Sequence, residues 1–222
     1  MPNSAKRLLL SLLLLGLSSA SVADAVYHAH CAICHGNDGG GNQALDAPNL
    51  THLSPAYMTR QITAFKAGWR TGDKPSSPAT VMATAIAAID PSTLELAVNQ
   101  AAALPAAWPE PQAADDLSGR NTAPVNLKKG RDHYTAFCGS CHGTSADGNE
   151  LLGAPSLLGM SSSYLARQYQ AFASGLRGGK TSDRFAQQMG RLAKALPNVD
   201  QIDNVMAYVE TLSLESQSMA SK

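Results

Sequence analysis

The chain has 222 residues, of which 15% are charged, and its basic and acidic side chains balance to a formal charge of zero. This balance argues against a nucleic-acid-binding protein, which normally carries a clear excess of Lys and Arg. The length allows one large domain or two small ones. Aromatic residues make up only 5% of the chain, which is few for two small cores, and small domains often depend on a metal or cofactor for stability.

The N-terminus has the pattern of an export signal. Lys6 and Arg7 precede an apolar run from Leu8 to Leu17, and small residues follow up to Ala23. The run is shorter than the about 20 apolar residues that a membrane-spanning helix needs. We therefore expect residues 1–23 to be a signal peptide that is removed, so that the protein is periplasmic. The alternative is a membrane anchor formed by an uncleaved N-terminal helix.

A short helix is expected from Asp24 onward, and it leads into the sequence Cys-Ala-Ile-Cys-His at residues 31–35. The same spacing recurs as Cys-Gly-Ser-Cys-His at residues 138–142, and the two copies contain all four cysteines of the chain. Cys-x-x-Cys-His is typical of covalent haem c attachment, in which both thiols bind the haem and the histidine ligates its iron. Two disulfides, two redox-active thiol pairs or a zinc site would leave the histidines without a role. The sequence therefore predicts two covalently bound haem c groups, attached through Cys31, Cys34, Cys138 and Cys141, with His35 and His142 as iron ligands.

The two motifs belong to a longer internal repeat. Residues 107 positions apart, here called repeat mates, match from Tyr27 and Tyr134 to Arg70 and Arg177. A repeat of this length indicates a duplicated domain. In each copy we expect a glycine-rich loop after the histidine, a helix over about 55–67 or 162–174, a segment with a methionine, and a last amphipathic helix.

The repeat and the composition between its copies define the expected domains. Residues 105–124 contain four prolines, which indicates a linker. We expect an all-α protein with one domain at 24–107, a linker at 108–124, a second domain at 125–214 and a C-terminal tail at 215–222. Residues 24–110 carry a formal charge of −3 and residues 111–222 a charge of +1, so the two halves are expected to meet different partners.

The repeat also selects a second ligand for each iron. Met82 and Met189 are repeat mates, and each lies 47 residues after its histidine, whereas no other two methionines are related in this way. The thioether of methionine is a known axial ligand of haem c iron. We therefore predict axial ligation by His35 and Met82 in one copy and by His142 and Met189 in the other. His52 is an alternative ligand of the first iron.

Two further pairs of repeat mates are candidates for contacts around the haem. Pro48 and Pro155 each lie 13 residues beyond the histidine, and their carbonyl groups are the expected acceptors for the second ring nitrogen, unless these prolines only shape a loop. Arg70 and Arg177 are candidates to hold haem propionates through charge-assisted hydrogen bonds. The alternative is that both are solvated arginines at helix ends.

These motifs together resemble the dihaem, two-domain cytochromes c of the c-four group. Besides the attachment motifs, the resemblance is carried by the Ala-Pro dipeptides that precede Leu50 and Leu157 and by the pattern Tyr-x-x-x-Gln-x-x-x-Phe-x-x-Gly-x-Arg from Tyr57 and from Tyr164. It implies two tandem class I cytochrome c domains, each a few short helices around a haem, packed about a pseudo-twofold axis in a periplasmic electron carrier. The segments at 78–82 and 185–189 replace the proline-flanked, methionine-rich loop of the family, which marks a divergent member.

The expected function is the transport of single electrons between respiratory partners, such as a membrane oxidase, a reductase or a dehydrogenase, with transient contact to membrane complexes. Histidine–methionine ligation predicts moderately high reduction potentials at both centres. Because both copies offer the same sixth ligand, neither has the open site that a catalytic haem needs, and we expect no enzymatic activity. The alternative is a dihaem oxidoreductase or the cytochrome subunit of a larger dehydrogenase or oxidase complex.

Overall fold

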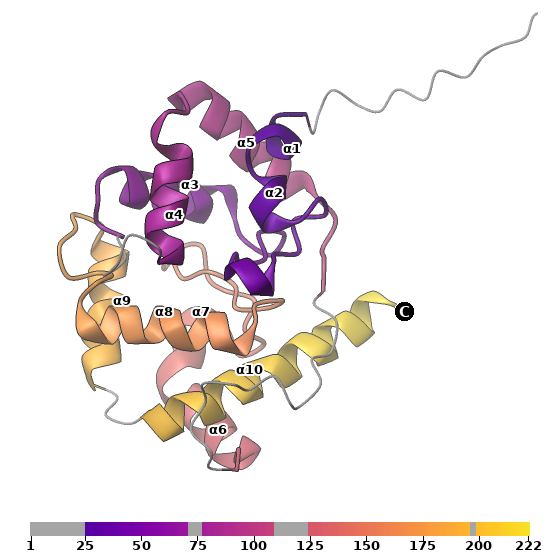
Figure 1. The fold of residues 1–222 in the computed structure, drawn as a ribbon. Helices are drawn as coiled ribbons and strands as arrows, with labels where there is room; N and C mark the ends of the chain where they lie inside the picture. The colour runs from indigo at the N-terminus through magenta and orange to yellow at the C-terminus, as the bar shows by residue number, and fades with distance from the viewer. Residues whose placement is uncertain (1–24, 71–76, 109–123, 196–198) are drawn as a thin grey trace, which may run out of the picture.

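A computed structural model describes residues 25–70, 77–108, 124–195 and 199–222 (Figure 1). Within these residues the named elements are all helical, and the only β geometry is that of three isolated bridges. The predicted all-α fold is therefore confirmed. The predicted signal peptide and most of the predicted linker lie outside the described residues.

The first half is a group of short helices whose starting points are set by local sequence. Each of its three longer helices begins with a proline, and the preceding Ser54, Ser77 or Asp90 accepts a hydrogen bond from the backbone three residues further on. The Ser77-Pro78 start places Met82 in the middle of a helix. The elements are α1 Ala25–His30, α2 Ala32–His35, η2 Gln43–Leu45, α3 Pro55–Lys66, α4 Pro78–Ala87 and α5 Pro91–Ala103.

The second half repeats this order with longer helices. Its α8 coincides with the helix predicted at 162–174, and Gly175 ends it in the left-handed conformation, with φ of 81°. Met189 also lies inside a helix, α9. The last helix continues to Ala220, so residues 215–220, which we expected in a tail, extend α10. The elements are α6 Leu127–His133, η3 Tyr134–Cys138, α7 Gly139–His142, α8 Ser162–Ser174, α9 Arg184–Ala195 and α10 Val199–Ala220.

Each half packs its first helix against its last. Helix α1 contacts α5, and α6 contacts α10. In the first half the backbone N–H of Tyr27 donates to Gln100 Oε1 at 2.7 Å. In the second half Gly130 lies where α6 crosses α10, and a Cβ there would collide with the backbone carbonyl of Asn204. The two halves thus reach the same arrangement through different contacts.

Two buried tyrosines connect these helices to the haem motifs. The repeat mates Tyr27 and Tyr134 are 0% and 1% exposed. Their hydroxyl groups donate to the carbonyl oxygens of Gly36 and Gly143, both at 2.6 Å. Because each glycine directly follows the histidine of its motif, the tyrosine fixes the loop that leaves the motif.

Candidate haem sites

Both attachment motifs form a single helical turn, in α2 and α7. All four cysteines are free and only partly exposed, so they do not form the disulfides of the alternative interpretation. Burial, with a smaller effect of the neighbouring thiol, raises the pKa of Cys31 and of Cys138 to about 11. Each motif therefore presents two free cysteines at the spacing that haem c attachment requires.

The histidines of the two motifs have the same environment. His35 and His142 are 6% and 9% exposed. Nδ1 of His35 lies 2.9 Å from Pro48 O, and Nδ1 of His142 lies 2.9 Å from Pro155 O. Burial lowers the pKa of both imidazoles, which favours the neutral form. A neutral ring that donates through Nδ1 has its Nε2 lone pair available for a metal.

A tight loop brings each proline carbonyl back to its histidine. Gly41 N donates to His35 O, and Gly148 N donates to His142 O, both at 2.8 Å. Gly41 has φ of 92°, and a Cβ at this position would lie 2.8 Å from the Ala47 carbonyl oxygen. Only glycine fits this close approach of two backbone segments.

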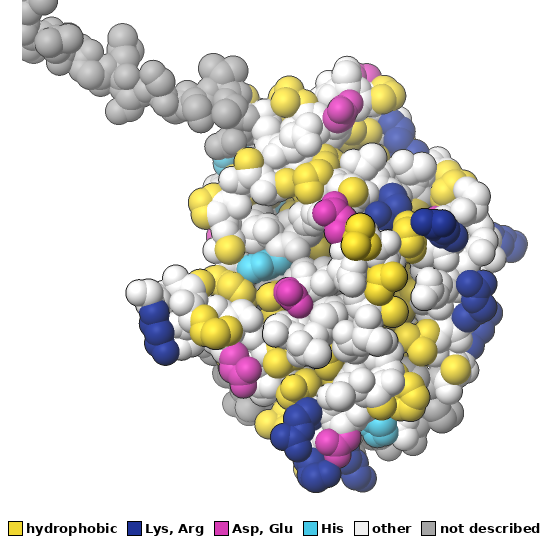
Figure 2. All heavy atoms as spheres, turned by 180° about the vertical axis from the view of Figure 1, so that it is seen from behind, with side chains coloured by type: hydrophobic (Ala, Val, Ile, Leu, Met, Phe, Trp, Pro, Cys, Tyr) yellow, Lys and Arg dark blue, Asp and Glu magenta, His cyan; other side chains and the backbone are white. Residues whose placement is uncertain are grey.

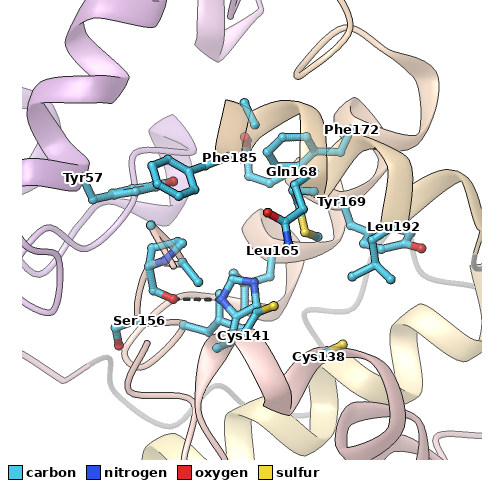
Figure 3. A pocket seen from close by; sticks show the side chains of 18 of the residues that line it. Tyr57, Cys138, Cys141, Ser156, Leu165, Gln168, Tyr169, Phe172, Phe185 and Leu192 are labelled. Carbon is cyan, nitrogen blue, oxygen red and sulfur yellow. Dashed lines mark hydrogen bonds between the residues drawn. The ribbon is translucent and has the colours of Figure 1, made fainter. Parts of the chain in front are cut away.

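The second half encloses a cavity of about 530 Å³, which lies in the usual size range of ligand pockets. His142 and Met189 both line it, from α7 and α9 respectively. Tyr57 of the first half reaches its edge (Figure 3). Figure 3 also shows the cysteines of the motif and the mainly apolar side chains around them, namely Cys138, Cys141, Leu165, Tyr169, Phe172, Phe185 and Leu192. Two thiols, an imidazole and a thioether around one apolar cavity are the groups that hold haem c, so these residues fit that cofactor.

In the first half, the predicted ligand Met82 lies half-buried on α4. It packs against a small cluster of Phe65, Ile86 and Leu94. The alternative ligand, His52, is engaged elsewhere, because its Nε2 lies 3.0 Å from Ala107 O and its ring centroid lies 4.3 Å from that of Trp108. The ligation of the first iron by Met82 stays a prediction, and the contacts of His52 favour Met82 over it.

Arg70 and Arg177 lie at the contact between the two halves, and each donates across it. Arg70 Nη2 lies 2.9 Å from both the hydroxyl of Tyr164 and Oε1 of Gln168. Arg177 Nη2 lies 2.8 Å from the corresponding atoms of the repeat mates Tyr57 and Gln61. An interface in which residue pairs recur with exchanged roles is isologous, like that of a twofold dimer.

These contacts correct the interpretation of the two arginines as solvated. Arg70 is 8% exposed and Arg177 is 7% exposed. Burial, together with the charge of Arg70, lowers the pKa of Arg177. Burial alone would raise the pKa of Tyr57, but the nearby charges of Arg177 and Arg70 outweigh it and lower this pKa. Among the described residues no acidic side chain forms a salt bridge with either arginine. Two buried cations without an acidic partner suit anionic groups such as haem propionates.

A second pair of arginines repeats the isologous arrangement with one difference. Arg167 Nε donates to Asp46 Oδ2 at 2.7 Å. Its repeat mate, Arg60, donates to the carbonyl of Gly153 at 2.7 Å, because glycine stands at the position that corresponds to Asp46. Only Arg167 is therefore neutralised by a carboxylate. The 107-residue offset makes all these residues repeat mates, but it does not indicate that they face one another.

The sequence model of the Cytochrome c family matches residues 22–106 and again residues 127–213, so the chain belongs to the cytochrome c family. Within that family it is similar to cytochrome c4. The cytochrome c4 of Azotobacter vinelandii is 29% identical over 216 residues, which cover 92% of this chain and 96% of the relative.

Solved structures give the same assignment of fold. Reduced recombinant cytochrome c4 from Pseudomonas stutzeri matches with a TM-score of 0.62 and 22% identity, over 86% of this chain and 98% of its own. A thiosulfate dehydrogenase from Marichromatium purpuratum matches with a TM-score of 0.63 and 29% identity, over 86% of this chain but only 38% of that chain. The predicted resemblance to the c-four group and the two tandem cytochrome c domains are thereby confirmed.

The predicted cofactors are confirmed as well, because two cytochrome c domains with these relatives imply two covalently bound haem c groups. The chain is accordingly a dihaem electron carrier. None of the helices in the described part of the chain is long and apolar enough to cross a membrane.

Proposed function

We propose that the chain is a periplasmic single-electron carrier in which His35 and Met82 ligate one haem iron and His142 and Met189 ligate the other. The observation that carries this proposal is the cavity that His142 and Met189 line together. The same two residue types recur 107 positions earlier, at His35 and Met82. The carrier takes electrons from one redox protein and delivers them to another, such as a membrane oxidase, reductase or dehydrogenase.

The residues of the chain hold and tune the two centres. When bound, haem iron supplies a reversible change between the ferric and ferrous states. The carbonyl groups of Pro48 and Pro155 fix the orientation of the histidine rings, and methionine raises the reduction potential relative to a second histidine. Arg70 and Arg177 supply positive charge for propionates between the halves. No residue has to move a proton or break a substrate bond for this function.

Ligation by methionine is tested in the purified dihaem protein. The oxidised protein should show the weak near-red absorption band of a sulfur-to-iron bond. Met82→Ala and Met189→Ala should each remove about half of this band, because each change removes one of two such bonds. Met58→Leu is the control, since Met58 is a core methionine with 6% exposure, and it should leave the band intact. A full band in either alanine variant would contradict the assignment of that methionine.

Export is tested on the mature protein from the native host. N-terminal sequencing of the periplasmic fraction should give Asp24 as the first residue, because cleavage is expected after Ala23. Recovery of the intact N-terminus in the membrane fraction would instead support an uncleaved anchor.

A dihaem oxidoreductase is the second candidate function. The match to 38% of a chain named thiosulfate dehydrogenase favours it, since a unit of this fold is part of an enzyme there. A catalytic haem needs a sixth site that opens readily. The reduced protein should therefore bind carbon monoxide slowly at both centres if it is a carrier, and rapid binding at one centre would support the enzyme.

A further inference from the structure

Helix α9 has a basic face. Arg184, Arg191 and Lys194 are exposed, whereas Gly190 and Ala193 of the same helix are buried. The spacing of seven and three residues places the three cations on one side of the helix. Among the described residues none of the three takes part in a salt bridge. Lys and Arg side chains gather along the side of the molecule where α9 lies (Figure 2).

The basic face adjoins the cavity of the second half. The same helix carries Met189 into the cavity, and Arg191 is one of the residues that line it. The guanidinium carbon of Arg184 lies 4.7 Å from the ring centroid of Phe185, which also lines the cavity. The nearest acidic residue in sequence, Asp183, accepts hydrogen bonds from the backbone at the start of α9. Residues 183–195 therefore have a net positive charge of two.

In the described part of the first half, the helix that corresponds to α9 has no such face. Helix α4 contains no charged residue. The repeat mates of the three cations are Ser77, Thr84 and Ala87. A partner that recognises positive charge beside a haem cavity would thus distinguish the second half from the first.

We propose that the basic face of α9 is the docking surface for an acidic redox protein, and that this partner exchanges electrons with the second half of the chain. The proposal rests on the proposed function, because it needs a haem in the cavity. One electron passes between the iron of this centre and the redox centre of the partner, and no bond is made or broken. The chain has no net charge that could attract an acidic protein. Attraction must come from a local surface, and cations around the electron exit steer an acidic partner to it.

The test uses the reduced dihaem protein and two small oxidants of opposite charge. Hexacyanoferrate(III), a trianion, represents the acidic partner, and tris(phenanthroline)cobalt(III), a trication, is its counterpart. A double variant with Arg184→Gln and Lys194→Gln, which leaves the cavity-lining Arg191 in place, should be oxidised by the anion roughly three to five times more slowly at about 10 mM ionic strength. The difference should nearly vanish at about 0.5 M salt, and the cation should react at least as fast as with the wild type.

A matched variant separates the position of the charges from their number. Lys128, Lys129 and Arg131 are exposed on α6, and none of them lines the cavity. Changing Lys128 and Lys129 to Gln removes the same charge as the α9 variant, and it should slow oxidation by the anion less than about twofold. Equal slowing in the α9 and α6 variants, or no slowing in either, would overturn the proposal. Binding of the wild type, but not of the α9 variant, to phosphatidylglycerol vesicles would assign the face to a membrane surface instead and would also overturn it.

The docking proposal and the proposed function fail in different ways. The wild type and both double variants should bind two haems and take up two electrons per chain in a reversible redox titration. If the wild type does not, the proposed function is wrong. If all variants titrate normally and the α9 variant reacts like the wild type, only the docking surface is wrong.

Discussion

The two halves of the chain share their cofactor ligands but differ in the charges around them. Both have the same histidine environment, with Nδ1 2.9 Å from a proline carbonyl. By contrast, α4 is uncharged whereas α9 is basic, and Arg167 pairs with the carboxylate of Asp46 whereas Arg60 donates to the carbonyl of Gly153. The duplicated domain thus repeats the groups that hold haem and varies the groups that a partner would meet. The interface between the halves contains both repeated contacts and contacts that differ. Changes at the interface therefore test the comparison most directly.

The largest effect is expected at the paired arginines of the interface. Arg70→Met and Arg177→Met should each lower the free energy of unfolding of the dihaem protein by about 2 to 3 kcal/mol, because each removes buried, charged hydrogen bonds across the interface. The two losses should be equal within about 0.5 kcal/mol, since the contacts are isologous. Urea unfolding followed by haem absorption measures both.

The double variant is the control for this equivalence. Arg70 and Arg177 share acceptors, because Gln61 and Gln168 each accept from both. The double variant should therefore lose less than the sum of the single losses. Additive losses, or single losses that differ by more than about 1 kcal/mol, would show that the interface is not symmetric in energy.

A smaller loss, confined to one half, is expected at the crossing of α6 and α10. Gly130→Ala should destabilise the second half by about 2 kcal/mol, because the new Cβ meets the carbonyl of Asn204 and must push the helices apart. Hydrogen exchange should accelerate in α10 and stay unchanged in α5. Gly175→Ala is the control for glycine removal itself: its Cβ would meet nothing within 4 Å, but φ of 81° makes alanine strained by about 1 kcal/mol.

The sequence predicted the haem-binding motifs well because covalent attachment demands a fixed spacing. The carbonyl oxygens of Pro48 and Pro155 lie 2.9 Å from Nδ1 of His35 and His142, as their spacing from the motifs indicated, while ligation by these histidines stays a prediction. The sequence also allows a helix to be predicted over residues 78–82, because Ser77-Pro78 is a typical helix start. The comparison of this segment with the loop of the family does not reveal the helix.

The interface was not predicted, for a physical reason. A sequence offset shows which residues are equivalent, but it does not show which residues touch. Only near a twofold axis do equivalent residues meet, as Arg70 and Arg177 do in an isolated β-bridge. His52 likewise lies against its repeat mate Gly159, where a Cβ would come within 2.7 Å of the imidazole. When one repeat mate is polar and the other is glycine, the pair can be predicted to be in contact only after the position of the twofold axis is known.

This contact gives a prediction that depends on pH. Burial lowers the pKa of His52, so the unfolded chain takes up the proton first as the pH falls below about 6.5. The wild type should therefore lose stability between about pH 7 and pH 5, and His52→Gln should lose less over the same range because Gln does not titrate. Parallel stability profiles of the two proteins would contradict a partly buried, neutral His52.

The smallest effect is expected where the isologous interface is broken, at Asp46. Asp46 has φ of 54° and pairs with Arg167, and its side chain is 16% exposed. Asp46→Asn tolerates this backbone conformation but removes the charge, so it should cost about 0.5 to 1 kcal/mol at low salt and less at high salt. Asp46→Gly introduces the residue that the second half has at this position. It also loses the ion pair, but it relieves about 1 kcal/mol of strain in the left-handed backbone conformation. Its free energy of unfolding should therefore lie within about 0.5 kcal/mol of that of the wild type. Unfolding in urea at two salt concentrations distinguishes these contributions. If the glycine variant lost as much stability as the asparagine variant, the ion pair and not the backbone would set the difference between the halves at this position.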